Sequence, residues 1–289
     1  MKEWIEAVRL RTLPVSVAGV IMALGYGVLN GGFNLAVWVL CLLFAVLAQI
    51  ASNFANEYYD YRDGLDKPGR EGPRRGVTEG DITPGAMLRA TYITLCFACA
   101  VGLSLLAWGP WWLIPVGAAI GLGVLAYSTG PYPLSRHGLG EVAVMLFFGV
   151  VPVNLTCFVM SGDWSVEVLL GSFSAGLMGA NVLLVNNYRD APDDATVGKR
   201  TLAVIFGRKA ASMLYLFNGY LAVALMLGVW MRLSAWVLIV PGAYLVAHTA
   251  MWLRMRRSEG AALNPMLGGT AMLMLLYCAL FAILSVAEQ

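Results

Sequence analysis

The chain has 289 residues, of which 59% are hydrophobic and only 12% are charged. Ordinary soluble domains carry about 25% charged residues, so this composition excludes a typical soluble globule. Apolar stretches recur from Leu13 to Val286, and each is long enough to cross a bilayer as a helix of about 20 residues. The net charge of +2 does not indicate nucleic-acid binding, because its distribution matters more than its sum in a membrane protein. We expect an all-α, polytopic membrane protein.

Nine membrane-spanning helices are predicted from apolar runs bounded by charged residues, Gly or Pro. They cover residues 13–30, 35–58, 86–107, 111–128, 139–160, 167–188, 210–231, 234–253 and 264–286. Together they are expected to form a single integral membrane domain over residues 1–289. The stretch Met1–Thr12 is short, charged and amphipathic, which is unlike a cleavable secretory signal. An odd number of crossings places the two termini on opposite sides of the membrane.

The distribution of Lys and Arg predicts the orientation, because short cytoplasmic loops are enriched in these residues. If the N-terminus is cytoplasmic, every Lys and Arg except Arg232 falls on the cytoplasmic side. We therefore expect a multi-pass protein of the cell (inner) membrane, with the N-terminus and the two longest charged loops in the cytoplasm. Most acidic residues also fall on this side, in two Asp-rich loops predicted at 57–85 and 188–209. The positive-inside rule does not explain them, so they need a separate role.

A short motif repeats at two predicted helix ends on the same membrane face. The segments Asn56–Asp60 and Asn186–Asp190 both have the pattern N-x-Y-x-D. A spacing of four places Asn and Asp on one helical face, and Asp194 continues the second series by another turn. The repeat therefore predicts two ladders of carboxamide and carboxylate groups that face each other.

Carboxylates gathered at helix C-terminal ends repel one another and the helix dipole unless a cation is present. Asp and Asn oxygens suit Mg²⁺, which prefers a few carboxylates plus substrate phosphate oxygens to a full protein cage. The ladders therefore imply a diphosphate held through metal. Basic residues that follow the ladders are expected to contact its oxygens: Lys67, Arg70, Arg74 and Arg75 after the first, and Lys199 and Arg200 after the second.

Four segments carry a family resemblance. They are RLRTLP at 9–14, NFANEYYDYRDGLDKPGREGPRRGVTEG at 53–80, AYSTGPYPLSRHGLGE at 126–141 and NNYRDAPDDATVGKRTLAVIFG at 186–207. With them, the chain resembles the UbiA superfamily of intramembrane aromatic prenyltransferases over its whole length. The GPRRG and GKRTLAV stretches resemble the 1,4-dihydroxy-2-naphthoate polyprenyltransferase branch, which belongs to menaquinone biosynthesis.

The resemblance implies a nine-helix bundle and Mg²⁺-dependent transfer of a polyprenyl group from an allylic diphosphate to dihydroxynaphthoate. In this branch the ring carboxyl is lost and a demethylmenaquinone forms. The small-molecule partners are thus a polyprenyl diphosphate and dihydroxynaphthoate, within a lipid bilayer and without nucleic acid. The resemblance assigns metal binding to residues of both ladders and to Asp66. The expected ligands are Asn56, Asp60, Asp66, Asn186, Asp190 and Asp194.

Other roles follow from the same resemblance and from charge. Asp60, Asp190, Asp194 and Tyr127 are the expected catalytic residues. The expected diphosphate-binding residues are Lys67, Arg70, Arg74, Ser128, Lys199 and Arg200. Because the naphthoate carries a carboxylate, Arg9 and Arg11 are candidates for binding the acceptor. Glu57 and Asp63 depart from the family pattern and are left unassigned.

Two alternatives remain open at this point. Related enzymes use other acceptors, such as 4-hydroxybenzoate, homogentisate, a tetrapyrrole or a glycerol phosphate. An ion-coupled transporter could also carry Asp and Asn at membrane depth, although transporter sites usually lie near the midplane. Neither the prenyl chain length nor the oligomeric state is predicted. His248 has no partner in the sequence. The motif Gly117-x-x-x-Gly121, followed by Gly123, predicts close helix packing.

Overall fold

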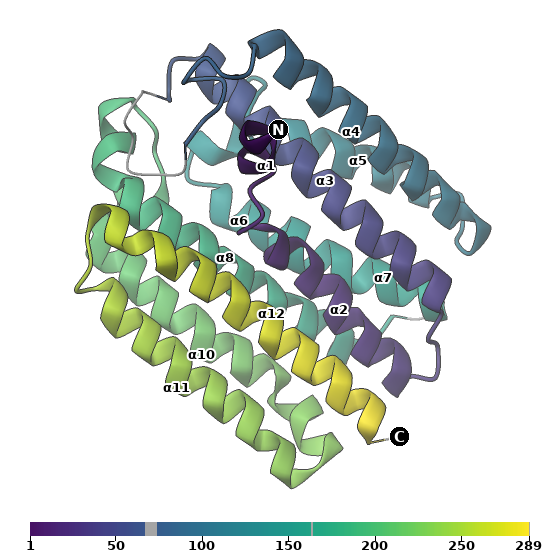
Figure 1. Ribbon diagram of the computed structural model, residues 1–289. Coiled ribbons are helices and arrows are strands. Elements are labelled where there is room, and N and C mark those ends of the chain that lie inside the picture. The colour runs from purple at the N-terminus through teal and green to yellow at the C-terminus, as the bar shows by residue number, and fades with distance from the viewer. Residues whose placement is uncertain (67–73, 163, 289) are drawn as a thin grey trace.

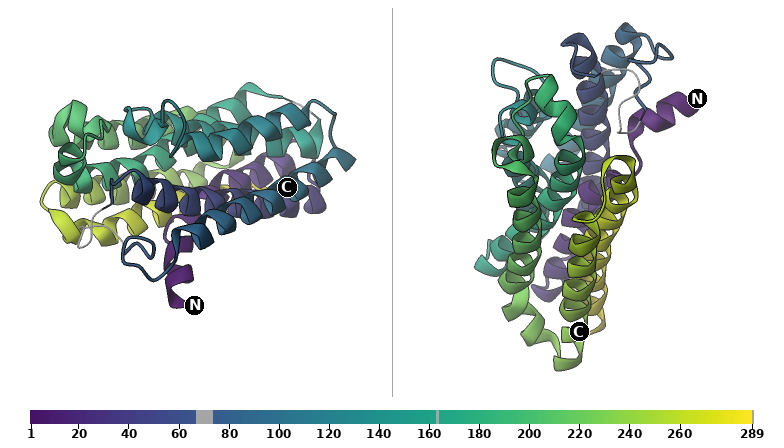
Figure 2. Two further views of the ribbon diagram at one scale, coloured as in Figure 1. Left: turned by 90° about the horizontal axis from the view of Figure 1, so that it is seen from above. Right: turned by 90° about the vertical axis from the view of Figure 1, so that its left-hand side faces the viewer.

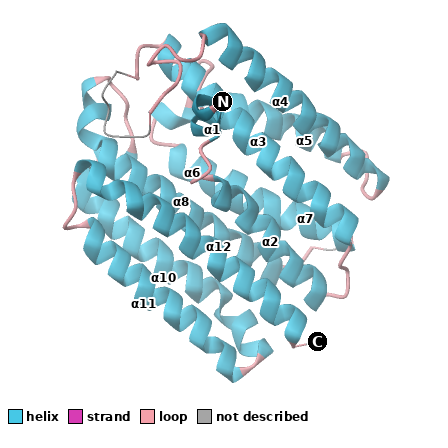
Figure 3. Ribbon diagram, viewed as in Figure 1, coloured by secondary structure: helices cyan, strands magenta, loops and turns pink. Residues whose placement is uncertain are grey.

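The computed structural model describes the chain except for residues 67–73, 163 and 289, and the described part contains helices and no strands (Figure 3). The α-helices are α1 (Lys2–Val8), α2 (Leu13–Leu29), α3 (Leu35–Arg62), α4 (Pro84–Ser104), α5 (Leu113–Ala126), α6 (Gly140–Met145), α7 (Val151–Ser161), α8 (Val166–Thr196), α9 (Leu202–Ile205), α10 (Gly207–Leu233), α11 (Ile239–Met255) and α12 (Asn264–Ala287). A π turn at Leu146–Val150 joins α6 to α7. Short 3₁₀ turns lie at Leu105–Ala107, Leu134–Arg136, Ala235–Leu238 and Gly260–Leu263.

Each of the nine predicted spans coincides with a helix or with a continuous helical segment. Seven described helical segments are long and apolar enough to cross a membrane, and the bent pair α1–α2 makes an eighth candidate. The ninth, α5, has 14 residues and is shorter than a full crossing. The predicted number of nine is therefore approximate, while the assignment as a multi-pass membrane protein holds.

The helices lie side by side in a bundle, with the two chain ends at opposite ends of it (Figure 1). The connections from α3 to α4 and from α8 to α9 lie at the same end (Figure 1). The short helix α1 stands off the bundle, as Figure 2 shows, and its Ala7 packs in a small cluster with Phe54 of α3. Arg9, whose φ is +55°, separates α1 from α2, and the two helices meet at 50°.

The main hydrophobic core lies between α2, α8, α10 and α12. Trp230, Tyr277 and Phe281 are fully buried there, and Trp230 Nε1 donates a hydrogen bond to the Tyr277 hydroxyl at 2.6 Å. Large apolar side chains also cover the outside of the bundle; Phe97 on α4 and Leu122 on α5 are more than half exposed. An apolar exterior is the surface that a lipid-facing helix requires.

The two Asp-rich loops are shorter than predicted. The helix α3 continues to Arg62, and α8 continues to Thr196, so Asp190 and Asp194 lie on a helix and not in the loop predicted at 188–209. Hydropathy ends the predicted helix at the first charges, whereas the helix itself continues because its polar face lines a cavity inside the bundle.

The structure shows the surroundings of His248 and of the α5 glycines, to which the sequence assigned no catalytic role. His248 is 1% exposed, its ring stacks on Tyr215 and Tyr244, and its Nε2 lies 3.1 Å from the Tyr215 carbonyl oxygen. His248 therefore helps to pack α11 against α10. The predicted close packing is wrong at Gly117, because no atom of a described residue lies within 4 Å of where its Cβ would be. It is confirmed at Gly123, where a Cβ would clash with the Phe147 ring. Gly117 borders open space, and a Cβ on Gly121 would reach only Leu95 Cδ1, at 4.0 Å.

Candidate active site

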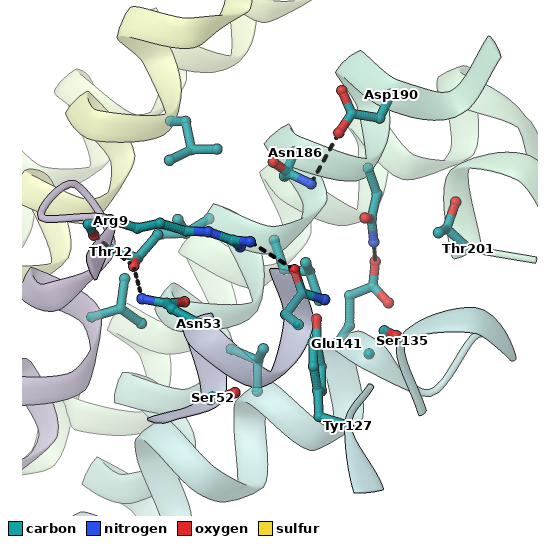
Figure 4. Close-up of a pocket in the computed structure, with 18 of the residues that line it drawn as sticks. Arg9, Thr12, Ser52, Asn53, Tyr127, Ser135, Glu141, Asn186, Asp190 and Thr201 are labelled. Atoms are coloured by element: carbon teal, nitrogen blue, oxygen red, sulfur yellow. Dashed lines mark hydrogen bonds between the residues drawn. The ribbon is translucent and has the colours of Figure 1, made fainter. Parts of the chain in front are cut away.

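A polar chamber of about 190 Å³ lies at the end of the bundle that holds both Asp-rich connections. Its walls come from the α1–α2 junction, α3, α6 and α8 (Figure 4). The repeated motif lines it from two sides, with Asn56 and Asp60 on α3 and with Asn186, Asp190 and Asp194 on α8. The ladders predicted from the spacing of four thus border one cavity.

On the α3 side, Asn56 links several elements. Its Oδ1 accepts hydrogen bonds from Arg9 Nη2 at 2.8 Å and from Arg75 Nη2 at 3.1 Å. Its Nδ2 donates to Ser128 Oγ at 3.3 Å, and Ser128 is fully buried behind the chamber lining. The Nε atom of Arg75 lies 3.1 Å from Asp66 Oδ2. Two guanidinium groups therefore reach the wall that carries the first ladder.

Lys199 bridges the two ladders. Its Nζ lies 3.4 Å from Asp60 Oδ2 and 3.9 Å from Asp194 Oδ1. Asp60 is 2% exposed, and Arg136 Nη2 lies 3.6 Å from its Oδ1, which accepts no hydrogen bond from any residue described. The bridge holds the first turn after α8 close to the end of α3.

On the α8 side, Arg189 makes a bidentate contact with Asp190, with Nε–Oδ1 at 2.6 Å and Nη2–Oδ2 at 2.9 Å. Asn186 Nδ2 donates to Asp190 Oδ2 at 3.3 Å (Figure 4), and Arg189 Nη1 donates to Asn264 Oδ1 at 2.7 Å. Such bidentate pairs fix geometry as well as charge. The second ladder is therefore anchored to α12.

The donor chemistry of the chamber fits magnesium. Within the described ranges, no three His, Cys, Asp or Glu side chains are close enough to hold a metal ion by themselves. Mg²⁺ uses one or two carboxylates together with substrate phosphate oxygens and water, so a complete protein cage is not required. The buried Asp60 Oδ1, which accepts no hydrogen bond from a described residue, is an oxygen suited to such an ion.

Several predicted residues lie outside the chamber lining. Arg11 and Arg200 are exposed, and Arg74 pairs with Asp81 at 2.5 Å and with Glu6 at 3.8 Å. Asp66 does not line the chamber either, but contacts it through Arg75. Lys67 and Arg70 fall in 67–73, outside the residues that the structure describes.

The two unassigned acids have separate surroundings. Glu57 is buried, and its Oε1 accepts a hydrogen bond from Val77 N at 3.1 Å, which holds the α3–α4 connection. Asp63 is exposed and pairs with Arg62 and Arg136 at 2.7 Å each. The hydrogen bond from Arg62 is the main cause that lowers the pKa of Asp63. Neither acid lines the chamber.

Arg136, Arg189, Asn187 and Glu141 are among the residues of this region that were not predicted. Arg136 and Arg189 pair with acids of the ladders, and Asn187 Nδ2 donates to Glu141 Oε1 at 2.8 Å on the chamber wall. Arg189 and Asn187 are the variable positions of the second N-x-Y-x-D motif, and Arg136 and Glu141 are single charges in a loop and at a helix start. No periodic pattern in the sequence marks them.

An apolar tunnel of about 320 Å³ continues from the chamber between α2, α3, α4, α5 and the α6–α7 segment. Both cavities are lined by Gln49, Ser52, Tyr127, Val144 and Phe148, so they meet at these side chains. The tunnel extends past Gly121 and Gly117 to Leu113, at the other end of α5. A polar chamber followed by a long apolar tunnel suits an amphiphile with a charged head and a hydrocarbon tail.

The UbiA prenyltransferase family profile matches residues 13–276. This chain belongs to the UbiA prenyltransferase family. It is 35% identical over 276 residues to the 1,4-dihydroxy-2-naphthoate octaprenyltransferase of Escherichia coli, covering 92% of this chain and 89% of that one. The enzyme of the same name from Mycobacterium tuberculosis is 36% identical over 282 residues, covering 95% and 94%.

Solved UbiA structures share this fold. The structure of a UbiA homologue from Archaeoglobus fulgidus bound to DMAPP and Mg²⁺ matches with a TM-score of 0.71, covering 98% of this chain and 99% of that one at 14% identity. The same homologue bound to GPP and Mg²⁺ matches with a TM-score of 0.72, covering 98% and 99% at 15% identity. The fold of this UbiA member is thus that of a membrane prenyltransferase family.

Proposed function

We propose that this chain transfers a polyprenyl group from an allylic diphosphate to 1,4-dihydroxy-2-naphthoate. The ring carboxyl is lost as CO₂ and diphosphate is released, which gives a demethylmenaquinol, the reduced form of a demethylmenaquinone. The observation that carries the proposal is the polar chamber, lined by both acid ladders, that continues into an apolar tunnel. The names of the two bacterial relatives support the acceptor. Incubation with this acceptor, a polyprenyl diphosphate and Mg²⁺, followed by mass analysis of the product, tests the proposal.

The diphosphate would lie between the ladders. We infer that Asp60, Asp190 and Asp194, with Asn56 and Asn186, would hold Mg²⁺ there, as Mg²⁺ accompanies prenyl diphosphates in the Archaeoglobus homologue. When bound, the ion neutralises the negative charge of the departing diphosphate. Lys199 and Arg75 line the same chamber and would contact phosphate oxygens directly.

The tunnel would hold the prenyl tail and keep water from the reacting carbon. Because Tyr127 lines both cavities, the allylic carbon is placed beside its ring when the head lies in the chamber and the tail in the tunnel. An allylic carbon that develops positive charge reacts with any water present, so an apolar wall favours attack by the aromatic ring. Arg9, which lines the chamber, is placed to orient the acceptor carboxylate.

Ion-coupled transport is not favoured by this arrangement. The acids lie at one end of the bundle, and the cavity that continues from them is apolar, whereas an ion path needs polar groups along its length. Prenylation of 4-hydroxybenzoate, homogentisate or a tetrapyrrole would be a different outcome of the same assay.

Filling the tunnel at two depths is expected to shorten the prenyl chain that the enzyme accepts. At a rise of 1.5 Å per residue, Gly121 lies about 9 Å and Gly117 about 15 Å along α5 from Tyr127. Gly121→Phe should therefore exclude shorter tails than Gly117→Phe does, and both variants should still use geranyl diphosphate. The product lengths formed from a mixture of prenyl diphosphates, measured by mass, show the cutoff.

The matched control is Gly228→Phe on α10. Gly228 is exposed and lines neither cavity, and no atom of a described residue lies within 4 Å of where its Cβ would be. This variant should keep the wild-type product lengths. If octaprenyl diphosphate is used equally by all three variants, the tail does not lie in this tunnel.

We propose that the chamber faces the cytoplasm and that the protein lies in the cell (inner) membrane. The support is the Lys and Arg distribution, in which only Arg232 falls on the other side. A cysteine at Arg74 should be protected from an impermeant thiol reagent in intact cells, whereas a cysteine at Ser234 should be labelled. Labelling of position 74 from outside would invert the orientation.

A further inference from the structure

One wall of the chamber contains buried polar atoms that belong to neither ladder. Glu141 Oε2, Ser135 Oγ and Thr201 Oγ1 are buried, and none has a hydrogen-bond partner among the described residues. All three residues line the chamber (Figure 4). Glu141 is 6% exposed. A buried polar atom without a partner is destabilising, so native proteins rarely keep one unless it has another role.

Glu141 is held in a fixed position. Asn187 Nδ2 donates to its Oε1 at 2.8 Å, which leaves Oε2 for another partner. Ser135 N donates to the Tyr127 carbonyl oxygen at 3.0 Å, and a Cβ on Gly140 would lie 3.8 Å from the Tyr127 hydroxyl oxygen. Glu141 therefore lies on the wall that contains Tyr127, where the chamber meets the tunnel.

The chemistry of this wall differs from that of the ladders. Asp60 and Asp194 lie within 4 Å of Lys199, whereas Glu141 has no ion pair with any residue that the structure describes. A diphosphate offers only hydrogen-bond acceptors, which a carboxylate repels. A phenolic hydroxyl offers a donor, and the proposed acceptor carries two such groups.

We propose that Glu141 accepts a hydrogen bond from a ring hydroxyl of the aromatic acceptor and is a catalytic residue of the prenyl transfer. This role rests on the proposed function, because it needs a phenolic acceptor beside the allylic carbon. The hydrogen bond orients the ring at the junction of the two cavities. It also shifts electron density from oxygen into the ring, which strengthens the ring carbon as a nucleophile.

The test combines Glu141→Gln with acceptors in which one hydroxyl at a time is a methyl ether. Gln keeps the shape of Glu and a carbonyl oxygen for Asn187, but loses the charge. Hydrogen bonds to charged groups contribute about 1.5–3 kcal/mol, so kcat with dihydroxynaphthoate should fall about 10- to 100-fold. The wild type should prenylate one of the two ethers as slowly as Glu141→Gln prenylates dihydroxynaphthoate. With that ether, Glu141→Gln should be no slower than the wild type. The KM for prenyl diphosphate and the Mg²⁺ dependence should be unchanged.

Glu57→Gln is the matched control, because Glu57 is an equally buried carboxylate that does not line the chamber. It should change the melting temperature in detergent without changing the preference for free hydroxyls. Equal slowing of the ether and the natural acceptor by Glu141→Gln would assign a structural role and overturn the proposal. A shifted Mg²⁺ dependence would overturn it by placing Glu141 with the metal.

The wild type alone provides a test that does not depend on folding of the variant. If both ethers react as fast as dihydroxynaphthoate, no hydroxyl is recognised and the proposal is wrong, while the proposed function holds. If the wild type does not prenylate dihydroxynaphthoate at all, the proposed function itself fails.

Discussion

Asp60→Asn and Asp190→Asn are each expected to reduce kcat by about 10³-fold, equivalent to ~4 kcal/mol of transition-state stabilisation. Each aspartate lies on a different ladder, and both line the chamber. Loss of one carboxylate removes a ligand for the ion that neutralises the leaving diphosphate. Because Asn has nearly the same shape as Asp, the melting temperature in detergent should change far less than the activity. Turnover with saturating Mg²⁺ measures the effect.

The matched controls are Asp63→Asn and Asp193→Asn. Asp63 comes directly after α3, the helix that contains Asp60, and Asp193 precedes Asp194 on α8. Both Asp63 and Asp193 are exposed, and neither lines the chamber. These variants should keep turnover within a few-fold of wild type. Near-normal turnover in Asp60→Asn or Asp190→Asn would contradict the assignment of both ladders to one metal–diphosphate site.

Lys199→Met is expected to reduce kcat/KM for the prenyl diphosphate by about 10²-fold. Lys199 Nζ is the cation between Asp60 and Asp194, at 3.4 and 3.9 Å, and the residue lines the chamber. The Lys199→Met substitution removes an ammonium group that would donate hydrogen bonds to the diphosphate oxygens. It also leaves two carboxylates less neutralised, so in the absence of substrate the variant should bind Mg²⁺ more tightly than wild type.

Arg200→Met is the matched control for Lys199→Met. The two residues are adjacent, but the side chain of Arg200 is exposed and outside the chamber lining, while its backbone N donates to the Arg136 carbonyl oxygen at 2.9 Å. A substitution keeps that backbone bond, so activity should stay close to wild type. Equal losses of kcat/KM in the two variants would mean that overall positive charge supports binding of the prenyl diphosphate. The contact of Lys199 with Asp60 and Asp194 would then have no special role.

The ladders could be predicted from the sequence because their spacing matches the helical period. A spacing of four fixes which residues share a face, whatever the packing of the rest of the bundle. The ends of the helices could not be predicted in the same way. Hydropathy falls at Tyr188, yet α8 continues to Thr196, because a polar helical face is stable where it lines a polar chamber.

Other residues of the site depend on tertiary structure alone. Arg136 and Glu141 are single charges whose partners lie far away in the sequence, on α3 and α8. Arg74 and Arg75 are neighbours of the same charge, yet one is exposed and the other is 6% exposed and contacts Asn56. Sequence alone also leaves two interpretations of Gly117-x-x-x-Gly121, since a missing side chain permits either close packing or a cavity.

The product of the reaction tests the central claim most directly. Membranes that contain the protein are incubated with Mg²⁺, a polyprenyl diphosphate, and either dihydroxynaphthoate or 4-hydroxybenzoate, with Asp60→Asn membranes as the blank. The account predicts a prenylated naphthoquinol that has lost its carboxyl as CO₂, with little product from 4-hydroxybenzoate. Efficient prenylation of 4-hydroxybenzoate with its carboxyl retained, and none of dihydroxynaphthoate, would contradict the proposed acceptor.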